Sequence, residues 1–332
     1  MFGSSFRRAA VLLTAATMAT TLGTVGVASP SAGESRDLCA TTGPIRAADL
    51  AQGVSTANCS LEGRLVVSGS AAVVVPPAGY GVGGDGVAGA GAADAPTLEV
   101  VNDGGVVTAS VDGALAPKPA SGTTTARWAS ACNDGSFTFG AGEFHKWTTT
   151  LKWHYRKGST PKRFSRFKAL KQIQIGMTNM RSGHNDCGLK GHPRANSKYA
   201  GGTSRAPNIK SKNGQNVCTA FNRFNVVGWG SLAGGMLGWT CYWWSTSGGQ
   251  PLIATDMKLS PSKVVVLGYT RSCSNKYDLQ SITTHEWGHA WGLGHVRNPN
   301  LTMHHFLTPC SYKLRTLGLG DFRGMKRLYG LR

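Results

Sequence analysis

An eleven-residue run that begins at His285, H-E-W-G-H-A-W-G-L-G-H, constrains the fold more strongly than any other part of the chain. His285 and His289 are spaced so that a helix would place both imidazoles on one face. Glu286 would project beside them. Gly292 would let the chain leave the helix in a tight turn, because glycine readily adopts the left-handed backbone conformation. That turn would bring His295 back towards the other two histidines.

Three imidazoles that meet in this way can bind one zinc ion and leave its fourth tetrahedral position open, which is typical of a catalytic site. Glu286 would then act as the general base that takes a proton from a zinc-bound water. The pair H-E-x-x-H alone could be a charged surface pattern of a long helix, but the added glycine and third histidine argue against that alternative. We therefore expect metal-assisted hydrolysis, with His285, His289 and His295 as zinc ligands and Glu286 as the catalytic residue.

The pattern H-E-x-x-H-x-x-G-x-x-H followed by a methionine turn resembles the metzincins. Met303 lies eight residues after His295, which is the spacing of the matrixins. The tail from Leu317 to Gly330, LGLGDFRGMKRLYG, is similar to the last helix of the matrixins, with Asp321 at a matching position. The chain therefore resembles a matrixin-like metzincin zinc metalloprotease of the bacterial secreted type.

That resemblance implies an α+β fold: a metzincin-type zinc protease domain with a mixed twisted sheet and about three helices, preceded by a small β-rich or partly disordered segment. It implies that Met303 forms a hydrophobic floor under the ligands and that Asp321 braces the methionine turn. It also implies a strand above the cleft that pairs with the substrate backbone, for which Leu252–Leu259 is the expected counterpart. The chain departs from the matrixin pattern at Val296 and at the two histidines after Met303, where the pocket for the residue after the cut is expected.

The beginning of the chain has the pattern of a secretory signal peptide. Arg7 and Arg8 precede an apolar stretch rich in Ala and Thr, and small residues near Ala28 suit a cleavage point. No later stretch is long and apolar enough to span a membrane. We therefore expect a secreted, extracellular protein.

The cysteines support the same location. There are eight, and none has the C-x-x-C spacing of a metal site, so we expect disulfides. Two lie before residue 130 and six after it, so each part can close its own bridges. Cys39 or Cys59 could instead bind the zinc, but the favoured prediction is a disulfide between them.

Charge divides the chain after the signal peptide. Residues 29–130 hold five Lys/Arg against nine Asp/Glu, a net charge of −4, and residues 131–332 hold 28 against seven, a net charge of +21. We expect a signal peptide over 1–28, a propeptide or accessory β-rich segment with a linker over 29–127, and a matrixin-like catalytic domain over 128–332. An acidic segment before a basic secreted protease favours a propeptide that docks over the cleft, although the P-R-C-G motif of matrixin propeptides is absent.

Periodicity and turn residues predict the elements. Ala78–Pro96 is a low-complexity Gly/Ala stretch that cannot pack a core by itself, and Lys118–Thr125 is expected to be a linker. A helix is expected to begin after Asp278. The other expected strands are Arg64–Ser68, Ala71–Val75, Thr97–Val101, Val106–Val111, Thr149–Tyr155, Asn225–Leu232, Gly238–Trp244 and Leu252–Leu259, and the other expected helices are Arg163–Met180 and Asp321–Tyr329.

The expected partner is a protein or peptide substrate, and we expect a monomer. The run Lys146–Lys171 is basic and aromatic, and its aromatic residues, Phe167 among them, fit the inner faces of a strand and a helix. A solvated basic face is favoured, with attraction to an anionic cell envelope as the alternative, and no nucleic acid is expected. Rival functions are a zinc amidase of cell-wall peptides and an envelope-binding protein with minor catalysis. A calcium ion or a second zinc ion stays an open alternative that no motif supports.

Overall fold

The computed structural model describes residues 37–92, 97–111, 129–140, 144–268 and 272–332. The expected signal peptide and the linker Lys118–Thr125 lie outside these residues. Within them, no helix combines the length and the apolar character that crossing a membrane requires.

Most of the strands form one mixed sheet of nine, in the order β10-β9-β13-β15-β14-β5-β7-β8-β2. In that order the strands are Ser197–Thr203, Leu151–Arg156, Asn225–Trp229, Leu252–Leu259, Gly238–Ser245, Tyr80–Asp85, Leu98–Asn102, Val106–Val111 and Val54–Ser55. The first five strands come from residues 131–332, called here the basic part of the chain. The last four come from residues 29–130, called here the acidic segment. The acidic segment therefore continues the sheet of the basic part, with β5 antiparallel to β14 at the junction.

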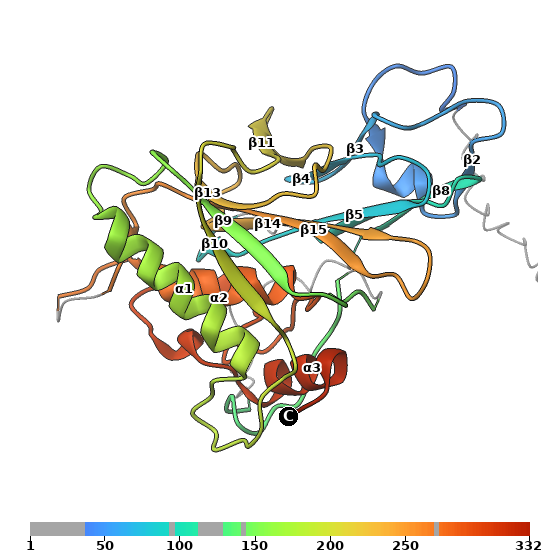
Figure 1. The fold of residues 1–332 in the computed structure, drawn as a ribbon. Helices are drawn as coiled ribbons and strands as arrows, with labels where there is room; N and C mark the ends of the chain where they lie inside the picture. The colour runs from blue at the N-terminus through green and yellow to red at the C-terminus, as the bar shows by residue number, and fades with distance from the viewer. Residues whose placement is uncertain (1–36, 93–96, 112–128, 141–143, 269–271) are drawn as a thin grey trace, which may run out of the picture. The chain divides into compact units, whose positions relative to one another are not determined.

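A second sheet also mixes the two parts of the chain. Its five strands have the order β1-β3-β4-β12-β11, which are Ile45–Arg46, Leu65–Ser68, Ala71–Val74, Gln215–Cys218 and Ile209–Lys212. It covers one face of the large sheet near β5, and α1 and α2 cover the opposite face (Figure 1). Two short pairs complete the strands: β16 (Val265–Val266) with β17 (Tyr277–Asp278), and β6 (Ala88–Gly89) with β18 (Phe306–Leu307).

The helices begin and end at residues suited to those positions. Helix α1 (Arg166–Ser182) starts at Ser165, whose hydroxyl accepts from the Lys168 N–H, and stops at Gly183 in the left-handed conformation. Helix α2 (Leu279–Ala290) starts at Asp278, whose side chain accepts from the Ser281 N–H, as the sequence predicts. The remaining helices are α3 (Leu319–Tyr329) and the short 3-10 turns η1 (Ala47–Leu50) and η2 (Lys313–Arg315).

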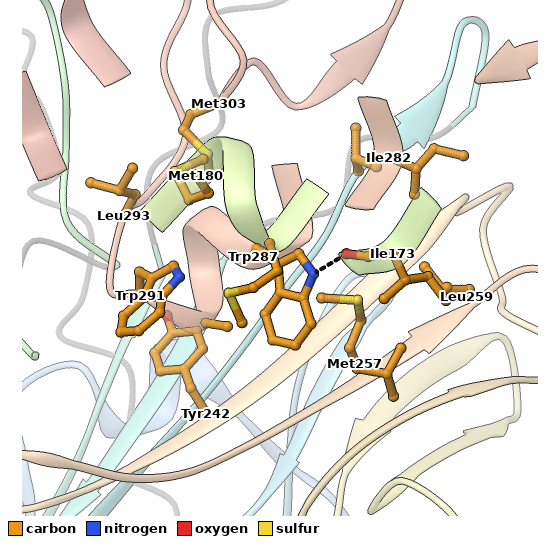
Figure 2. Packing of buried hydrophobic residues seen from close by; sticks show 14 of the residues in the cluster. Ile173, Met180, Tyr242, Met257, Leu259, Ile282, Trp287, Trp291, Leu293 and Met303 are labelled. Carbon is orange, nitrogen blue, oxygen red and sulfur yellow. Dashed lines mark hydrogen bonds between the residues drawn. The ribbon is translucent and has the colours of Figure 1, made fainter. Parts of the chain in front are cut away.

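Two apolar cores follow from these layers. One lies between the helices and the large sheet, where the indole of Trp287 on α2 packs near Met257 of β15 and donates to the carbonyl of Ile173 on α1 at 3.1 Å (Figure 2). The other lies between the two sheets and includes Val73 and Val82 from the acidic segment. The acidic segment therefore packs against the rest of the chain through a buried core as well as through strand pairing.

The disulfides stay within the two parts of the chain, as expected. Cys39 pairs with Cys59 before residue 130, so the preferred pairing of these two cysteines is confirmed. After residue 130 the bridges are Cys132–Cys187, Cys218–Cys241 and Cys273–Cys310. No free cysteine remains among the described residues.

Three expectations from the sequence are wrong. Leu252–Leu259 is a strand but lies inside the sheet, paired with β13 and β14, so it cannot be the strand above the site. The strand nearest the helix that carries His285 and His289 is β14, which contacts α2 more extensively than β15 does. Phe167, expected on an inner face, is 77% exposed. The sequence predicts no strand within the low-complexity stretch Ala78–Pro96, but this stretch contains β5, which lies inside the large sheet.

The glycines of β5 explain why a sequence so poor in side chains forms a buried strand. A Cβ at Gly81 would collide with the indole of Trp244, and a Cβ at Gly83 would collide with the ring of Tyr242. Both aromatic residues belong to β14, the strand paired with β5 in the same sheet. A Cβ at Gly84 would lie 2.8 Å from the sulfur of Cys218. Side chains of the neighbouring elements therefore fill the space next to these glycines, where β5 has no side chains of its own.

We expect Gly81→Ala to lower the free energy of unfolding by about 1–3 kcal/mol, because its Cβ would displace the buried indole of Trp244. Gly43→Ala is the matched control, since no atom lies within 4 Å of a Cβ there, and it should change stability by about 0.5 kcal/mol or less. Urea denaturation of the oxidised protein, followed by tryptophan fluorescence, measures both. Equal effects at the two positions would contradict this account of the packing.

Candidate metal centre

Helix α2 carries two of the three histidines of the expected metal site. All 12 residues of this helix are buried, including His285 and His289 one turn apart. The chain then turns at Gly292, whose φ of 100° is left-handed, and returns with His295. Nε2 of His285 lies 2.8 Å from Nε2 of His289 and 3.2 Å from Nε2 of His295. In the part of the chain that the structure describes, this is the one group of histidines, cysteines or acids placed to hold a metal ion.

Backbone carbonyls fix the orientation of two of the imidazoles. Nδ1 of His285 lies 2.7 Å from the carbonyl oxygen of Thr302, and Nδ1 of His289 lies 2.9 Å from that of Leu293. Because a carbonyl only accepts, each Nδ1 carries the proton and Nε2 keeps its lone pair. Burial lowers the pKa of His289 to about 4, and burial with the neighbouring imidazoles holds the pKa values of His285 and His295 well below the usual range.

This donor set fits a zinc ion. The three imidazoles are neutral at physiological pH, and their ligand atoms lie within 4.8 Å of one another. Three histidine nitrogens with a free fourth position are the ligands of catalytic zinc, whereas structural zinc sites have four protein ligands. The group is therefore able to bind one catalytic zinc ion.

Glu286 follows His285 on α2, and its carboxylate is buried and faces β14. Thr240 of β14 donates its hydroxyl to Oε2 at 2.6 Å, and the N–H of Val87 donates to Oε1 at 3.0 Å. Burial raises the pKa of Glu286 to about 8, and the two hydrogen bonds oppose that shift. A bound zinc ion would lower the pKa further through its charge. The carboxyl group is thus suited to gaining and losing a proton near neutral pH.

The methionine turn lies against the same helix. Met303 is buried, and its sulfur occupies the space that a Cβ at Gly288 would enter. The carboxylate of Asp321, in the first turn of α3, accepts from the N–H groups of Thr302 at 2.9 Å, Met303 at 3.1 Å and Gly318 at 2.8 Å. Thr302 is also the residue whose carbonyl holds the first histidine of the site, so this carboxylate connects the last helix to a ligand.

The histidines after Met303 do not join the ligand group. Nδ1 of His304 lies 3.1 Å from the carbonyl of Val296, and the ring centre of His305 is 5.8 Å from that of His295. Burial lowers the pKa of His305 to about 4.

A carboxylate from the acidic segment reaches the site, and no pattern in the sequence predicted it. Asp85, at the end of β5, places Oδ2 3.3 Å from Nδ1 of His289 and Oδ1 3.2 Å from Nδ1 of His295. Oδ2 also accepts from the Thr97 hydroxyl at 2.7 Å, and Oδ1 from the Gly86 N–H at 2.8 Å. The side chain is completely buried.

The sequence pattern also gave no sign of the partners of Glu286. Thr240 and Val87 lie far from it in the chain, and they reach it because β14 and the residues after β5 pass over α2. One signal for β5 is its composition: four of its six residues are Gly or Val, and Asp85 ends the strand, next to a strand rich in tryptophan.

Comparison with known proteins identifies a family. A family model described as matrixin matches residues 136–330, which is more than half of the chain. The match begins after the acidic segment and includes all three histidines. No curated protein matches the chain.

We expect Asp321→Ala to lower the free energy of unfolding by about 3–5 kcal/mol, because three buried N–H groups would lose their acceptor. Asp103→Ala is the matched control. Asp103 also accepts from two backbone N–H groups, of Gly105 and Val106, but it is exposed, so water can replace it at a cost of about 1 kcal/mol or less. Chemical denaturation of both variants measures the difference, and similar losses would argue against a bracing role for Asp321.

Proposed function

Since the chain belongs to the matrixin family and is a zinc metalloendopeptidase, we propose that it is secreted as a precursor and that Glu286 is the general base of the active enzyme. The observation that carries the proposal is the position of Glu286, which follows His285 on α2 and has a buried carboxylate within hydrogen-bonding distance of β14. Its substrate is a protein, as the family implies.

The zinc ion and the protein groups around it have different roles in the reaction. When bound, zinc supplies a Lewis acid that polarises the scissile carbonyl and makes water more acidic. Glu286 takes the proton of the attacking water on its carboxylate and delivers it to the nitrogen of the departing amine. Thr240 keeps one carboxylate oxygen in place during this exchange, because its hydroxyl donates to Oε2. The backbone carbonyls of Thr302 and Leu293 hold the imidazoles of His285 and His289 in the tautomer that a metal needs.

The supporting residues have separate roles in this proposal. Met303 provides an apolar floor under α2, and Asp321 holds the turn that carries it. Gly292 permits the return of the chain to the site, because a Cβ there would collide with the carbonyl oxygen of His145 and the backbone is left-handed. The strand role that the family suggests belongs to β14, which lies next to Glu286.

Secretion as a precursor is supported by three observations. The chain begins with a signal-like pattern over residues 1–28. The described residues contain four disulfides, which persist in oxidising compartments. The acidic segment and the basic part have opposite net charge, which favours their association before a cut. We propose that residues 29–127 are removed from the mature enzyme.

We expect Glu286→Ala to retain zinc but to lower kcat/KM on a protein substrate such as casein by about 10²–10⁴-fold or more, because the general base is lost. Zinc content by mass spectrometry and cleavage rates of the processed enzyme measure the two effects.

Two controls complete this experiment. A chelator should abolish cleavage by the unaltered enzyme, and added zinc should restore it. Substantial turnover by a zinc-loaded Glu286→Ala enzyme would rule out this role for the residue. Absence of chelator-sensitive cleavage of any protein would favour a zinc amidase of cell-wall peptides instead.

We expect the mature secreted enzyme to begin near residue 128. N-terminal sequencing of the protein from culture medium checks this. A mature protein that begins near residue 29 would show that the acidic segment persists as an accessory part.

A further inference from the structure

Strand β5 pairs with β14, the strand to which the backbone of a peptide substrate would bind. It pairs antiparallel with β14 over six residues, from Ser245 opposite Tyr80 to Thr240 opposite Asp85. β14 is the last strand that the basic part contributes on this side of the sheet, because every strand beyond it comes from the acidic segment. An extended peptide adds to such an edge by main-chain hydrogen bonds. In this structure β5 uses those bonds.

The same stretch of chain is also held by the residues that follow the methionine turn. Ala88–Gly89 (β6) pair in parallel with Phe306–Leu307 (β18), and the Ala88 N–H donates to the carbonyl of His305 at 3.0 Å. The carbonyl of Val87 accepts from the Leu237 N–H at 2.8 Å. The chain is therefore held by main-chain hydrogen bonds both to the β14 region and to the residues that follow the methionine turn.

Between these two strands the chain contacts the catalytic groups directly. The N–H of Val87 donates to Oε1 of Glu286, so one oxygen of the general base is engaged. The backbone at Gly86 comes so close to the carbonyl of Gly238 that a Cβ would not fit. Asp85, one residue earlier, directs both carboxylate oxygens at the imidazoles of His289 and His295.

We propose that Tyr80–Gly89 is a built-in inhibitor that occupies the place of a peptide substrate in the precursor, with the carboxylate of Asp85 as its anchor at the metal centre. The proposal rests on the proposed function above and adds its regulation. The acidic segment inhibits through three kinds of contact: a strand on β14, a hydrogen bond to Glu286, and a carboxylate against two zinc ligands.

The chemistry of the anchor follows from charge. Three neutral imidazoles around a zinc ion leave its double positive charge uncompensated by the ligands. A carboxylate buried beside them is attracted strongly, because the surroundings are poorly screened. Thr97 and the Gly86 N–H donate to the same carboxylate and hold it in position, and both belong to the acidic segment. Removal of this segment therefore removes the anchor together with the residues that orient it.

The first measurement is the rate of zinc release, which does not depend on peptidase activity. The full chain is prepared with Glu286→Gln, which prevents self-processing, and zinc is transferred to the chromogenic chelator 4-(2-pyridylazo)resorcinol. Loss of a carboxylate partner of zinc ligands weakens metal binding about 10–100-fold. We expect Asp85→Ala and Asp85→Asn to speed zinc release by a comparable factor. Glu62→Ala, which removes an exposed acid of the same segment, should leave the rate unchanged.

The second measurement is the hydrogen exchange of β14, which reports whether this strand is paired with β5. The amides of Gly238–Ser245 that bond to β5 should exchange slowly in the intact chain and fast after the acidic segment is cut off and separated, whereas those that bond to β15 should stay slow in both forms. In the chain with Glu286 intact, the uncut precursor should be inactive on casein. Asp85→Asn should make it partly active. After removal of the segment, the Asp85 variants, the Glu62 variant and the unaltered enzyme should have equal activity, since all then share one sequence.

The outcomes separate the inhibitor from the proposed function. Equal zinc-release rates for Asp85→Asn and the unaltered chain would overturn the anchor, as would an uncut precursor as active as the processed enzyme. Thermal unfolding identifies any variant that fails to fold, and Asp85→Asn, which keeps the size of the side chain, then replaces Asp85→Ala. If the processed enzyme cleaves no protein, the proposed function fails, while zinc release and exchange at β14 still test the occupation of the site.

Discussion

The burial of α2 is the constraint on which the rest of the structure depends. Every residue of this helix is buried, yet its polar side chains include those of His285, Glu286 and His289, the candidate site residues. Each must find partners inside the protein, because buried polar groups without hydrogen bonds are costly. The loop after the helix supplies carbonyls for the imidazoles, and β14 supplies a hydroxyl for the carboxylate. The turn at Gly292, the methionine turn and the last helix are arranged to bring these partners to α2.

The parts of the site that could be predicted from the sequence are those that depend on short spacing. A helix places His285 and His289 on one face whatever surrounds it, and the glycine before His295 indicates the turn. Asp278 could be identified as a cap because capping needs only a polar side chain just before the helix. The position of Asp321 relative to the methionine turn was accessible through the resemblance to matrixins, since the intervening chain has a fixed length in that family.

The parts that could not be predicted depend on which strands become neighbours. Gly238–Ser245 and Leu252–Leu259 are both apolar runs, and nothing in either run indicates which one lies beside Glu286, because strand order is decided by contacts across the whole sheet. β5 was hidden for a different reason. Its glycines have the composition of a flexible stretch, and their fit against Trp244 and Tyr242 is visible only once the two strands are paired. Asp85 approaches the histidines because of that pairing, and it has no local spacing to them that a motif could record.

The disulfide pattern has a consequence for how firmly the acidic segment is held. Cys39–Cys59 closes within the segment, and the other bridges close within the basic part, so no bridge among the described residues crosses between them. While the chain is continuous, the segment is tethered beside its binding surface at a high effective concentration. A single cut in the connecting chain turns that tether into an ordinary equilibrium between two molecules. In the secreted precursor that we propose, dilution into the medium would then favour separation, so the release of the enzyme would depend on how much protein is secreted and into what volume.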